Sequence, residues 1–329
     1  MRKYEFDNLK FLMIFLVVFG HLLEILNAGI SRNLYILIYT FHIPVFVFVS
    51  GYFFKFKPKN IIKYVIYYII WQILYSLFDI YFLKTSQAIS FKVPYWILWY
   101  LVSLISWCLI TKLFDVKSNK IKGLLLIISF VISILSGFLF TKRSGYVFSI
   151  SRTLTYFPYF LLGFYLRNLE TNFLNLKNAE NKLNIKKFSI VLLIFIICFA
   201  YFIININNIE FGMLYGSHGY KELHNYTPLF KTILSIFSLS IIILLLNFIS
   251  KKKLPIISDI GKSTLMVYLL HGFIIKTIHN KLKIFVFSDL INILISFILS
   301  IVIVLLFGYL LPILIQKIKA KFSNKKATV

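Results

Sequence analysis

The sequence predicts an all-α membrane protein, a polytopic bundle of about ten transmembrane helices. Hydrophobic residues make up 60% of the 329 residues and charged residues only 14%. The mean hydropathy is +0.86, a value typical of a chain whose solvent is lipid. Apolar runs of about 20 residues, the length that crosses a hydrocarbon core of about 30 Å, recur along the whole chain. Because the polar breaks between them are short, we expect residues 1–329 to form a single transmembrane domain with no separate soluble domain.

The ten predicted spans follow one another in order with short connections. They cover residues 9–28, 34–54, 64–83, 95–111, 123–140, 148–166, 188–206, 228–249, 260–278 and 288–315. The first span follows the basic stretch Met1–Lys10. Glu5, Asp7 and the lack of a small-residue cleavage site after the apolar run argue against a signal peptide. The longest outer connection, from Asn205 to Thr227, joins the seventh and eighth spans and is rich in Asn, Tyr, Gly and His.

Lysine and arginine residues predict the orientation. An even number of spans puts both termini on one side, and the loops on that side carry 24 of these residues against nine in the opposite loops. By the positive-inside rule, both termini are therefore expected to be cytoplasmic. The formal charge of +25 is then a topology signal and an attraction to membrane lipid with anionic headgroups. No nucleic acid is expected as a partner, because the charge is divided among separate short loops.

Three histidines fall inside predicted spans: His21, His42 and His271. An ionisable side chain at that depth costs at least about 2.5 kcal/mol, so it is retained mostly where it lines a cavity, meets a partner or does chemistry. At a rise of 1.5 Å per residue, His21 lies about 18 Å and His271 about 16 Å from the cytoplasmic surface, and His42 about 12 Å below the outer surface. These depths agree with one common site slightly outward of the midplane.

Glu24 follows His21 by three residues, which puts a carboxylate and an imidazole on one helical face. In this arrangement an acid orients a basic imidazole. A lone histidine inside a bundle is more often a hydrogen-bonding packing residue, and this interpretation stays open for His42 and His271. Three further histidines fall in outer loops, where we expect exposed, solvated side chains: His218, His224 and His279.

Motifs of soluble enzymes are absent from the sequence. It contains no Walker loop, dinucleotide fingerprint, zinc-protease helix or nucleophile elbow. Cys108 and Cys198 fall in different spans and are predicted to be packing residues rather than a disulfide or a metal pair. We therefore expect no metal.

Four stretches, in chain order, carry a resemblance to a known family. They are Tyr4-Glu5-Phe6-Asp7-Asn8-Leu9-Lys10 followed by His21; Phe41-His42-Ile43-Pro44-Val45-Phe46 with Ser50-Gly51-Tyr52; Arg152 with Tyr156-Phe157-Pro158-Tyr159-Phe160 and Gly163; and Gly261-Lys262-Ser263 with Tyr268 and His271. Trp96 and Trp99, at the mouth of the fourth span, fit the same pattern. Over essentially its whole length the chain resembles the acyltransferase 3 family of integral-membrane acyltransferases, especially its fucose 4-O-acetylase-like branch. Many members have arginine where Lys10 stands, and a lysine does not make the planar bidentate phosphate contact.

The resemblance implies transfer of an acyl group, most often acetyl, from cytosolic acetyl-CoA or another acyl-CoA to a hydroxyl of a saccharide or glycolipid in a bacterial cell envelope. His21 is then expected to be the general base that removes the acceptor proton, with Glu24 orienting it. Arg152 is expected to stabilise developing negative charge. An acyl-histidine intermediate on His21 is the competing mechanism.

Further residues are assigned to binding on the same basis. The substrate-binding candidates are His42, His271, Trp96, Trp99 and Tyr268, and the candidates for the phosphates of acyl-CoA are Lys10, Lys55 and Lys57. The polar outer loop 205–227 suits sugar hydroxyls and is a candidate for acceptor recognition. Two rival functions stay open: a transporter or flippase for an envelope polysaccharide or lipid-linked sugar, and a membrane scaffold without chemistry of its own.

Overall fold

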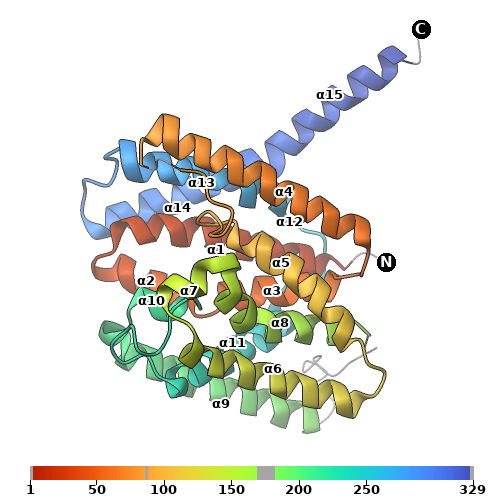
Figure 1. The fold of residues 1–329 in the computed structure, drawn as a ribbon, viewed down its shortest axis with the longest axis vertical. Coiled ribbons are helices and arrows are strands. Elements are labelled where there is room, and N and C mark those ends of the chain that lie inside the picture. The colour runs from red at the N-terminus through yellow and green to blue at the C-terminus, as the bar shows by residue number, and fades with distance from the viewer. Residues whose placement is uncertain (1–2, 86–87, 169–181, 327–329) are drawn as a thin grey trace. The chain divides into compact units, whose positions relative to one another are not determined.

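The computed structural model describes residues 3–85, 88–168 and 182–326, and within these ranges every regular element is a helix (Figure 1). Seven of the described helical segments are long and apolar enough to cross a membrane: Tyr4–Leu26, Gly29–Phe53, Pro58–Leu83, Asn119–Leu139, Lys186–Ile204, Pro228–Phe248 and Asp289–Lys321. The all-helical fold and the membrane-spanning character are thus confirmed.

The expected count of about ten spans is not confirmed. The fourth predicted span is the short helix α5 (Trp99–Ile110). The sixth and ninth correspond to α8 (Ile150–Asn168) and α13 (Thr264–Lys281). Polar and charged side chains interrupt both, so neither reaches the apolarity of the seven. The three helices that are too short or too polar to count as spans therefore carry candidate functional residues: Trp99, Arg152, Tyr268 and His271.

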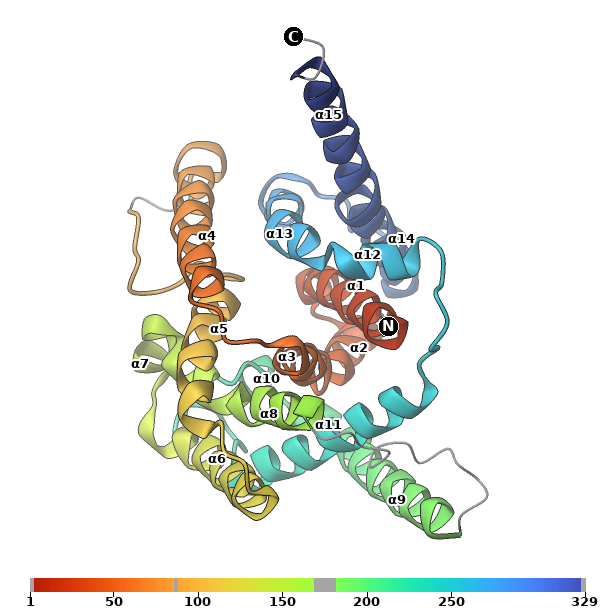
Figure 2. The same ribbon diagram turned by 90° about the vertical axis from the view of Figure 1, so that its right-hand side faces the viewer.

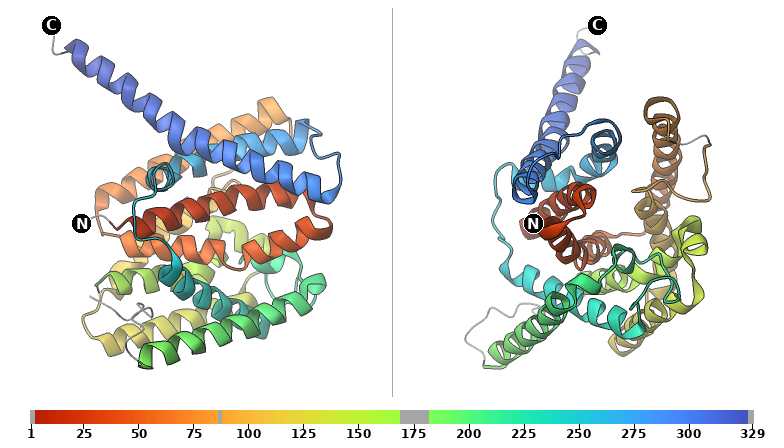
Figure 3. Two further views of the ribbon diagram at one scale, coloured as in Figure 1. Left: turned by 180° about the vertical axis from the view of Figure 1, so that it is seen from behind. Right: turned by 90° about the vertical axis from the view of Figure 1, so that its left-hand side faces the viewer.

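The chain forms two compact units, Met1–Tyr35 with Ile249–Val329, and Ile36–Phe248. The first unit is built from α1 (Tyr4–Leu26), the start of α2 (Gly29–Tyr39), α12 (Ile257–Lys262), α13, α14 (Asp289–Leu305), the π-helical turn η6 (Leu306–Leu310) and α15 (Leu311–Lys326). Helix α1 packs against α12, α13 and α14 (Figure 2). Helices α14 and α15 continue one another through η6 as a single long rod (Figure 3).

Polar side chains hold the first unit together at the amino-terminal end of α1. The Asn8 amide donates to the carbonyls of Ser250 and Lys252 at 2.8 and 3.0 Å, and its oxygen accepts from the Ser258 hydroxyl at 2.7 Å. Beside it, a Cβ added to Gly261 would lie 2.0 Å from the Asp7 carbonyl oxygen, so only glycine lets α12 approach α1 this closely. These contacts explain why the first and last sequence motifs contain asparagine and glycine.

The second unit is arranged around α8. It contains α3 (His42–Phe53), α4 (Pro58–Leu77) with η1 (Phe78–Leu83), α5 with η2 (Thr111–Phe114), α6 (Asn119–Leu139), α7 (Lys142–Tyr146), η3 (Val147–Ser149), α8, α9 (Lys182–Ile204), η5 (Ile206–Asn208), α10 (Phe211–Leu214) and α11 (Pro228–Phe248). Helix α8 contacts α3, α5 and α6, and α11 contacts α9, α3 and α6. The arginine helix is thus an interior element of its unit.

Helices α3 and α8 touch through their backbones. A Cβ at Gly51 would lie 1.9 Å from the Phe160 carbonyl oxygen, and a Cβ at Gly163 would lie 2.0 Å from the Phe48 carbonyl oxygen. Small residues at such a crossing allow close van der Waals packing, which replaces the hydrophobic driving force that is missing in lipid. This crossing fixes the helix that begins at His42 against the helix that carries Arg152.

The second predicted span, 34–54, is broken at Thr40 and Phe41. Pro44 has no backbone N–H and cannot donate to the Thr40 carbonyl one turn earlier. The Ser238 hydroxyl of α11 donates to that carbonyl instead, at 2.6 Å. The His42 ring satisfies the Ile38 carbonyl, with 2.8 Å between Nδ1 and oxygen. The break is therefore stabilised by side chains, as irregular backbone inside a membrane protein requires.

The α3–α8 crossing predicts a sharp difference between two glycine substitutions. Gly163→Ala forces the helices apart and should lower the free energy of unfolding by about 1–3 kcal/mol, seen as a lower thermal midpoint in detergent. Gly123→Ala, in α6 with nothing within 4 Å of the added Cβ, is the matched control and should be neutral or stabilising by about 0.5–1 kcal/mol. Equal midpoints for the two variants would contradict the crossing.

Candidate functional site

The first unit brings His21, Glu24 and His271 together. His21 Nδ1 lies 3.2 Å from Glu24 Oε2 on one face of α1, as the spacing predicts. The His21 ring stacks on the His271 ring of α13, with 5.7 Å between centroids and an interplanar angle of 19°. The Tyr268 ring, one turn earlier on α13, lies 6.5 Å from the His271 ring. Four sequence-predicted residues therefore form one cluster.

Hydrogen bonding assigns the tautomers of both rings. A carboxylate only accepts hydrogen bonds, so the proton between His21 and Glu24 lies on His21 Nδ1, and the lone pair lies on Nε2. His271 is buried, and its Nδ1 lies 2.9 Å from the Val267 carbonyl oxygen, so it too carries its proton on Nδ1. The His21 side chain is 14% exposed, whereas His271 is fully buried. An imidazole that is hydrogen-bonded to a carboxylate in this way can act chemically as a general base.

The second unit surrounds Arg152 with aromatic rings. The guanidinium carbon lies 5.0 Å from the Trp99 ring centroid and 4.8 Å from that of Tyr146. Its Nε donates to the Tyr215 carbonyl at 3.2 Å, and one terminal nitrogen lies 3.5 Å from the Tyr146 hydroxyl. Arg152 is 9% exposed, and among the described residues of its unit all of these partners are neutral. Stacking between two rings holds the planar cation in one orientation.

The outer loop folds back onto α8 through its main-chain carbonyls. Ser151 and Thr155 donate to the Gly216 carbonyl at 2.9 and 3.3 Å, and Tyr156 donates to the Leu214 carbonyl at 3.1 Å. Gly216 has φ +66°, a left-handed conformation that glycine adopts without strain. These bonds place the loop beside the Arg152 guanidinium.

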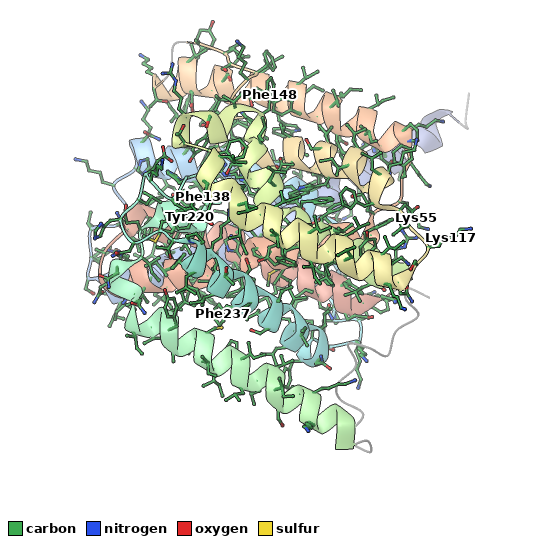
Figure 4. All side chains as sticks on the ribbon, turned by 60° about the horizontal axis from the view of Figure 1, so that its bottom comes forward. Lys55, Lys117, Phe138, Phe148, Tyr220 and Phe237 are labelled. Atoms are coloured by element: carbon green, nitrogen blue, oxygen red, sulfur yellow. The ribbon has the colours of Figure 1, made fainter. Side chains whose placement is uncertain are left out.

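The same loop is also anchored on α6. The Tyr220 hydroxyl donates to the Ile134 carbonyl at 2.6 Å, and its backbone N–H donates to the Gly137 carbonyl at 2.8 Å. Figure 4 shows the Tyr220 and Phe138 rings together, with 4.9 Å between centroids. The central part of the loop is therefore a fixed part of the second unit.

His218 corrects the sequence analysis. We expected an exposed loop histidine, but His218 is 7% exposed, and its Nδ1 lies 3.2 Å from the Ser217 hydroxyl. Its ring lies 6.2 Å from the Tyr146 ring and 6.1 Å from the Tyr215 ring. His224 and His279 are exposed as expected. The error arose because the folding of the loop depends on hydrogen bonds to α8 and α6, which no local pattern reveals.

His42 belongs to the second cluster. Its ring lies 4.4 Å from the Tyr39 ring, which in turn lies 6.1 Å from the Tyr215 ring. Because His42 Nδ1 satisfies the Ile38 carbonyl, the residue also has the packing role that the sequence analysis left open.

The Trp96–Trp99 segment is positioned by Gln72 of α4. Its amide nitrogen donates to the Ser90 carbonyl at 2.6 Å, and its oxygen accepts from the Tyr95 backbone N–H at 2.8 Å. The Tyr95 hydroxyl donates to Asp79 at 2.8 Å. Burial, followed by this bond to Asp79, raises the pKa of Tyr95 well above its ordinary value, so the hydroxyl keeps its proton and the anchor persists. Both tryptophans are half-buried, and Trp99 is the one that contacts Arg152.

The lysines assigned to acyl-CoA lie on α1 and in the segment that joins α3 to α4. Lys10 forms an ion pair with Asp7 on α1, with 2.9 Å between Nζ and Oδ1. Lys55 and Lys57 are exposed in the segment between α3 and α4. Figure 4 shows Lys55 projecting at the margin of the helices rather than between them.

The predicted site residues thus fall into two clusters. His21, Glu24, Tyr268 and His271 lie in the first unit, whereas His42, Trp96, Trp99 and Arg152 lie in the second. Their convergence on one common site stays a prediction. Sequence reasoning missed Lys231, a buried lysine in the first turn of α11, although a charge inside a predicted span was a signal for it.

A helical membrane protein with an imidazole–carboxylate pair and a separate buried guanidinium has the groups that acyl transfer requires. Comparison with known families agrees: residues 3–315 match the family model described as an acyltransferase domain, Acyl_transf_3. The chain therefore belongs to the acyltransferase 3 family and is a membrane acyltransferase. This membership favours acyl transfer over the flippase and scaffold alternatives. Comparison with curated proteins found no match, and comparison with solved structures found none either.

Docking of the outer loop makes a prediction for Tyr156→Phe. Loss of the hydroxyl that donates to the Leu214 carbonyl should weaken the loop contact by about 1 kcal/mol and raise hydrogen exchange in residues 211–220 by about fivefold. The control is Tyr165→Phe, on the same helix, whose hydroxyl donates to the Phe114 carbonyl. Exchange mass spectrometry that shows the same loop protection in both variants would contradict the docking.

Proposed function

We propose that this membrane acyltransferase is an O-acyltransferase that moves an acetyl group from acetyl-CoA to a hydroxyl of a cell-envelope saccharide or glycolipid. Family membership supports acyl transfer in a membrane. The observation that carries the reaction chemistry is the His21–Glu24 pair, because it presents a basic imidazole nitrogen whose tautomer is set by a carboxylate.

In the proposed reaction, His21 Nε2 takes the proton of the acceptor hydroxyl as its oxygen attacks the thioester carbonyl. The resulting tetrahedral intermediate carries a negative charge on the former carbonyl oxygen. Its collapse breaks the carbon–sulfur bond, and the departing thiolate of coenzyme A receives the proton from His21. Glu24, as hydrogen-bond acceptor of Nδ1, stabilises the imidazolium while it holds the proton. No net proton is taken up or released.

Arg152 is proposed to bind an oxygen of the acyl donor or acceptor and to stabilise negative charge. Its stacking between Trp99 and Tyr146 supports this role, since a preorganised cation needs no reorientation during the reaction. Trp99, together with Trp96 and His42 of the same unit, is proposed to contact the acceptor. Tyr268 and His271 are proposed to do so beside His21.

We propose that the protein lies in the plasma membrane of a bacterium, with both termini and the acyl-CoA binding side facing the cytoplasm. Lys55 and Lys57 are exposed and suit the phosphates of coenzyme A as point charges. Lys10 already pairs with Asp7, so a phosphate there has to share the ammonium with a carboxylate. We therefore expect Lys10 to contribute less to donor binding than the two exposed lysines.

The base assignment predicts that His21→Ala lowers kcat by about 10²–10⁴-fold, the usual contribution of a general base. Transfer is measured with purified protein, radiolabelled acetyl-CoA and an envelope extract as acceptor. His279→Ala, which changes an exposed histidine on α13, is the control and should retain wild-type transfer. Near-normal transfer by His21→Ala would remove the assignment.

A substitution of Glu24 and a labelling experiment together distinguish direct transfer from an acyl-histidine intermediate. Glu24→Gln keeps a hydrogen-bonding side chain but removes the charge that stabilises the imidazolium, so direct transfer should fall by at least about tenfold. Rapid quench into denaturant near neutral pH, with labelled acetyl-CoA and no acceptor, should leave the wild-type protein unlabelled. A stoichiometric acetyl label on His21 would establish the covalent mechanism instead.

A further inference from the structure

Lys231 is a buried lysine in the second unit to which the reaction described above gives no role. It is 3% exposed and lies in the first turn of α11, where its backbone N–H donates to the Thr227 carbonyl. The positive end of the helix dipole disfavours a cation at this position. Burial of a charge without an opposite charge adds a further cost of several kcal/mol.

The described partners of Lys231 are two hydroxyls. Its Nζ lies 3.1 Å from Ser136 Oγ on α6 and 3.1 Å from Thr155 Oγ1 on α8. Each hydroxyl gives its own proton to a carbonyl, Ser136 to Ser133 at 2.7 Å and Thr155 to Gly216 at 3.3 Å. Both therefore accept from Lys231, and neither supplies negative charge.

No described carboxylate of the second unit compensates this charge. Asp79 accepts from Tyr95, Glu210 accepts from the His224 backbone and Glu222 accepts from the Gly219 backbone. Asp115 is exposed. Within the described residues of the unit, neither Lys231 nor Arg152 forms an ion pair within 4 Å.

The two cations are linked through one turn of α8. Thr155, which accepts from Lys231, lies three residues after Arg152 and so shares its helical face. The carbonyls of Tyr215 and Gly216 bind Arg152 and Thr155 respectively. The folded outer loop thus covers the turn that joins them.

Lys231 also lines a cavity of its unit. The cavity has a volume of about 20 Å³, and its lining includes Thr40, Tyr156, Ser235 and Ser238 with Lys231 itself. A cavity of this size holds one water molecule or one oxygen of a larger group. The third proton of the ammonium is available to that oxygen.

We propose that Lys231 of α11, with Arg152 one turn before Thr155 on α8, binds an anionic oxygen of the acceptor, and that the acceptor is therefore an acidic saccharide bearing a carboxylate or a phosphate. The anion supplies the negative charge that the second unit lacks, and the positive end of the helix dipole at the amino terminus of α11 stabilises it. This inference rests on the proposed O-acyltransferase function and names the substrate class of that site.

Two matched acceptor pairs test the proposal with purified full-length protein and radiolabelled acetyl-CoA. One pair is a uronic-acid oligosaccharide and its carboxyl-reduced form, and the other is a phosphorylated oligosaccharide and its phosphatase-treated form. Wild-type protein should prefer the acidic member of at least one pair by about tenfold to a hundredfold, the ratio expected of a charge-assisted hydrogen bond. The pair that shows the preference distinguishes carboxylate from phosphate.

Variants of α11 assign the preference to Lys231. Lys231→Gln should reduce the acidic-to-neutral ratio towards one, whereas Lys231→Arg should retain it. The control Ser240→Ala, on the same helix and bonded to the Phe237 carbonyl, should also retain it. Because the ratio is measured within one sample, a loss of folded protein does not change it.

Equal transfer to both members of each pair, transfer to none of the four acceptors, or an unchanged ratio in Lys231→Gln would overturn the proposal. Failure of the proposed function is a different result. If an unfractionated envelope extract receives no label from wild-type protein, O-acyl transfer itself is wrong. If the extract is labelled while the purified pairs show no preference, only the acidic substrate class is wrong.

Discussion

The two clusters depend on one constraint: backbone carbonyls that leave the helical pattern inside a membrane protein need donors other than water. Each group left unsatisfied costs several kcal/mol in hydrocarbon. Side chains supply these donors at every break described here. Ser238 and His42 satisfy the carbonyls freed where α2 ends, Asn8 satisfies the segment before α12, and Tyr156 satisfies the folded outer loop. The helix breaks are consequently rigid, and a rigid backbone holds a reactive side chain in a defined position.

The same constraint gives several residues two roles. His42 is a substrate-binding candidate and also the donor that stabilises a helix break. Arg152 holds the Tyr215 carbonyl while two rings fix its plane. A residue committed in this way loses little conformational freedom when a ligand binds, which favours affinity and transition-state stabilisation alike. Substitution of such a residue changes structure and chemistry together. Conservative substitutions of residues on neighbouring turns are therefore needed to separate the two effects.

Sequence reasoning predicted local features and missed those that depend on tertiary contacts. The His21–Glu24 pair follows from helical spacing alone, and apolar runs revealed the membrane fold. The burial of His218 depends on bonds between the outer loop and two helices, so hydrophilic composition predicted exposure wrongly. Lys231 was detectable: 24 and nine of the 36 lysine and arginine residues were assigned to the two sides of the membrane, which leaves Arg152, Lys231 and Lys262 assigned to neither side. The expected count of about ten spans is not confirmed at α8 and α13, where polar residues break the apolar pattern.

The two units treat their charges in opposite ways. Each described ion pair of the first unit joins residues three apart on one helix: Lys10 with Asp7, His21 with Glu24, and Lys262 with Asp259. A carboxylate beside an imidazole favours the protonated state of the ring, which suits the proposed role of His21 as a general base. Within the described part of the second unit, Arg152 and Lys231 have only neutral partners. Because neutral partners do not balance the positive charge of these two side chains, the second unit is suited to bind a negatively charged group rather than to transfer protons.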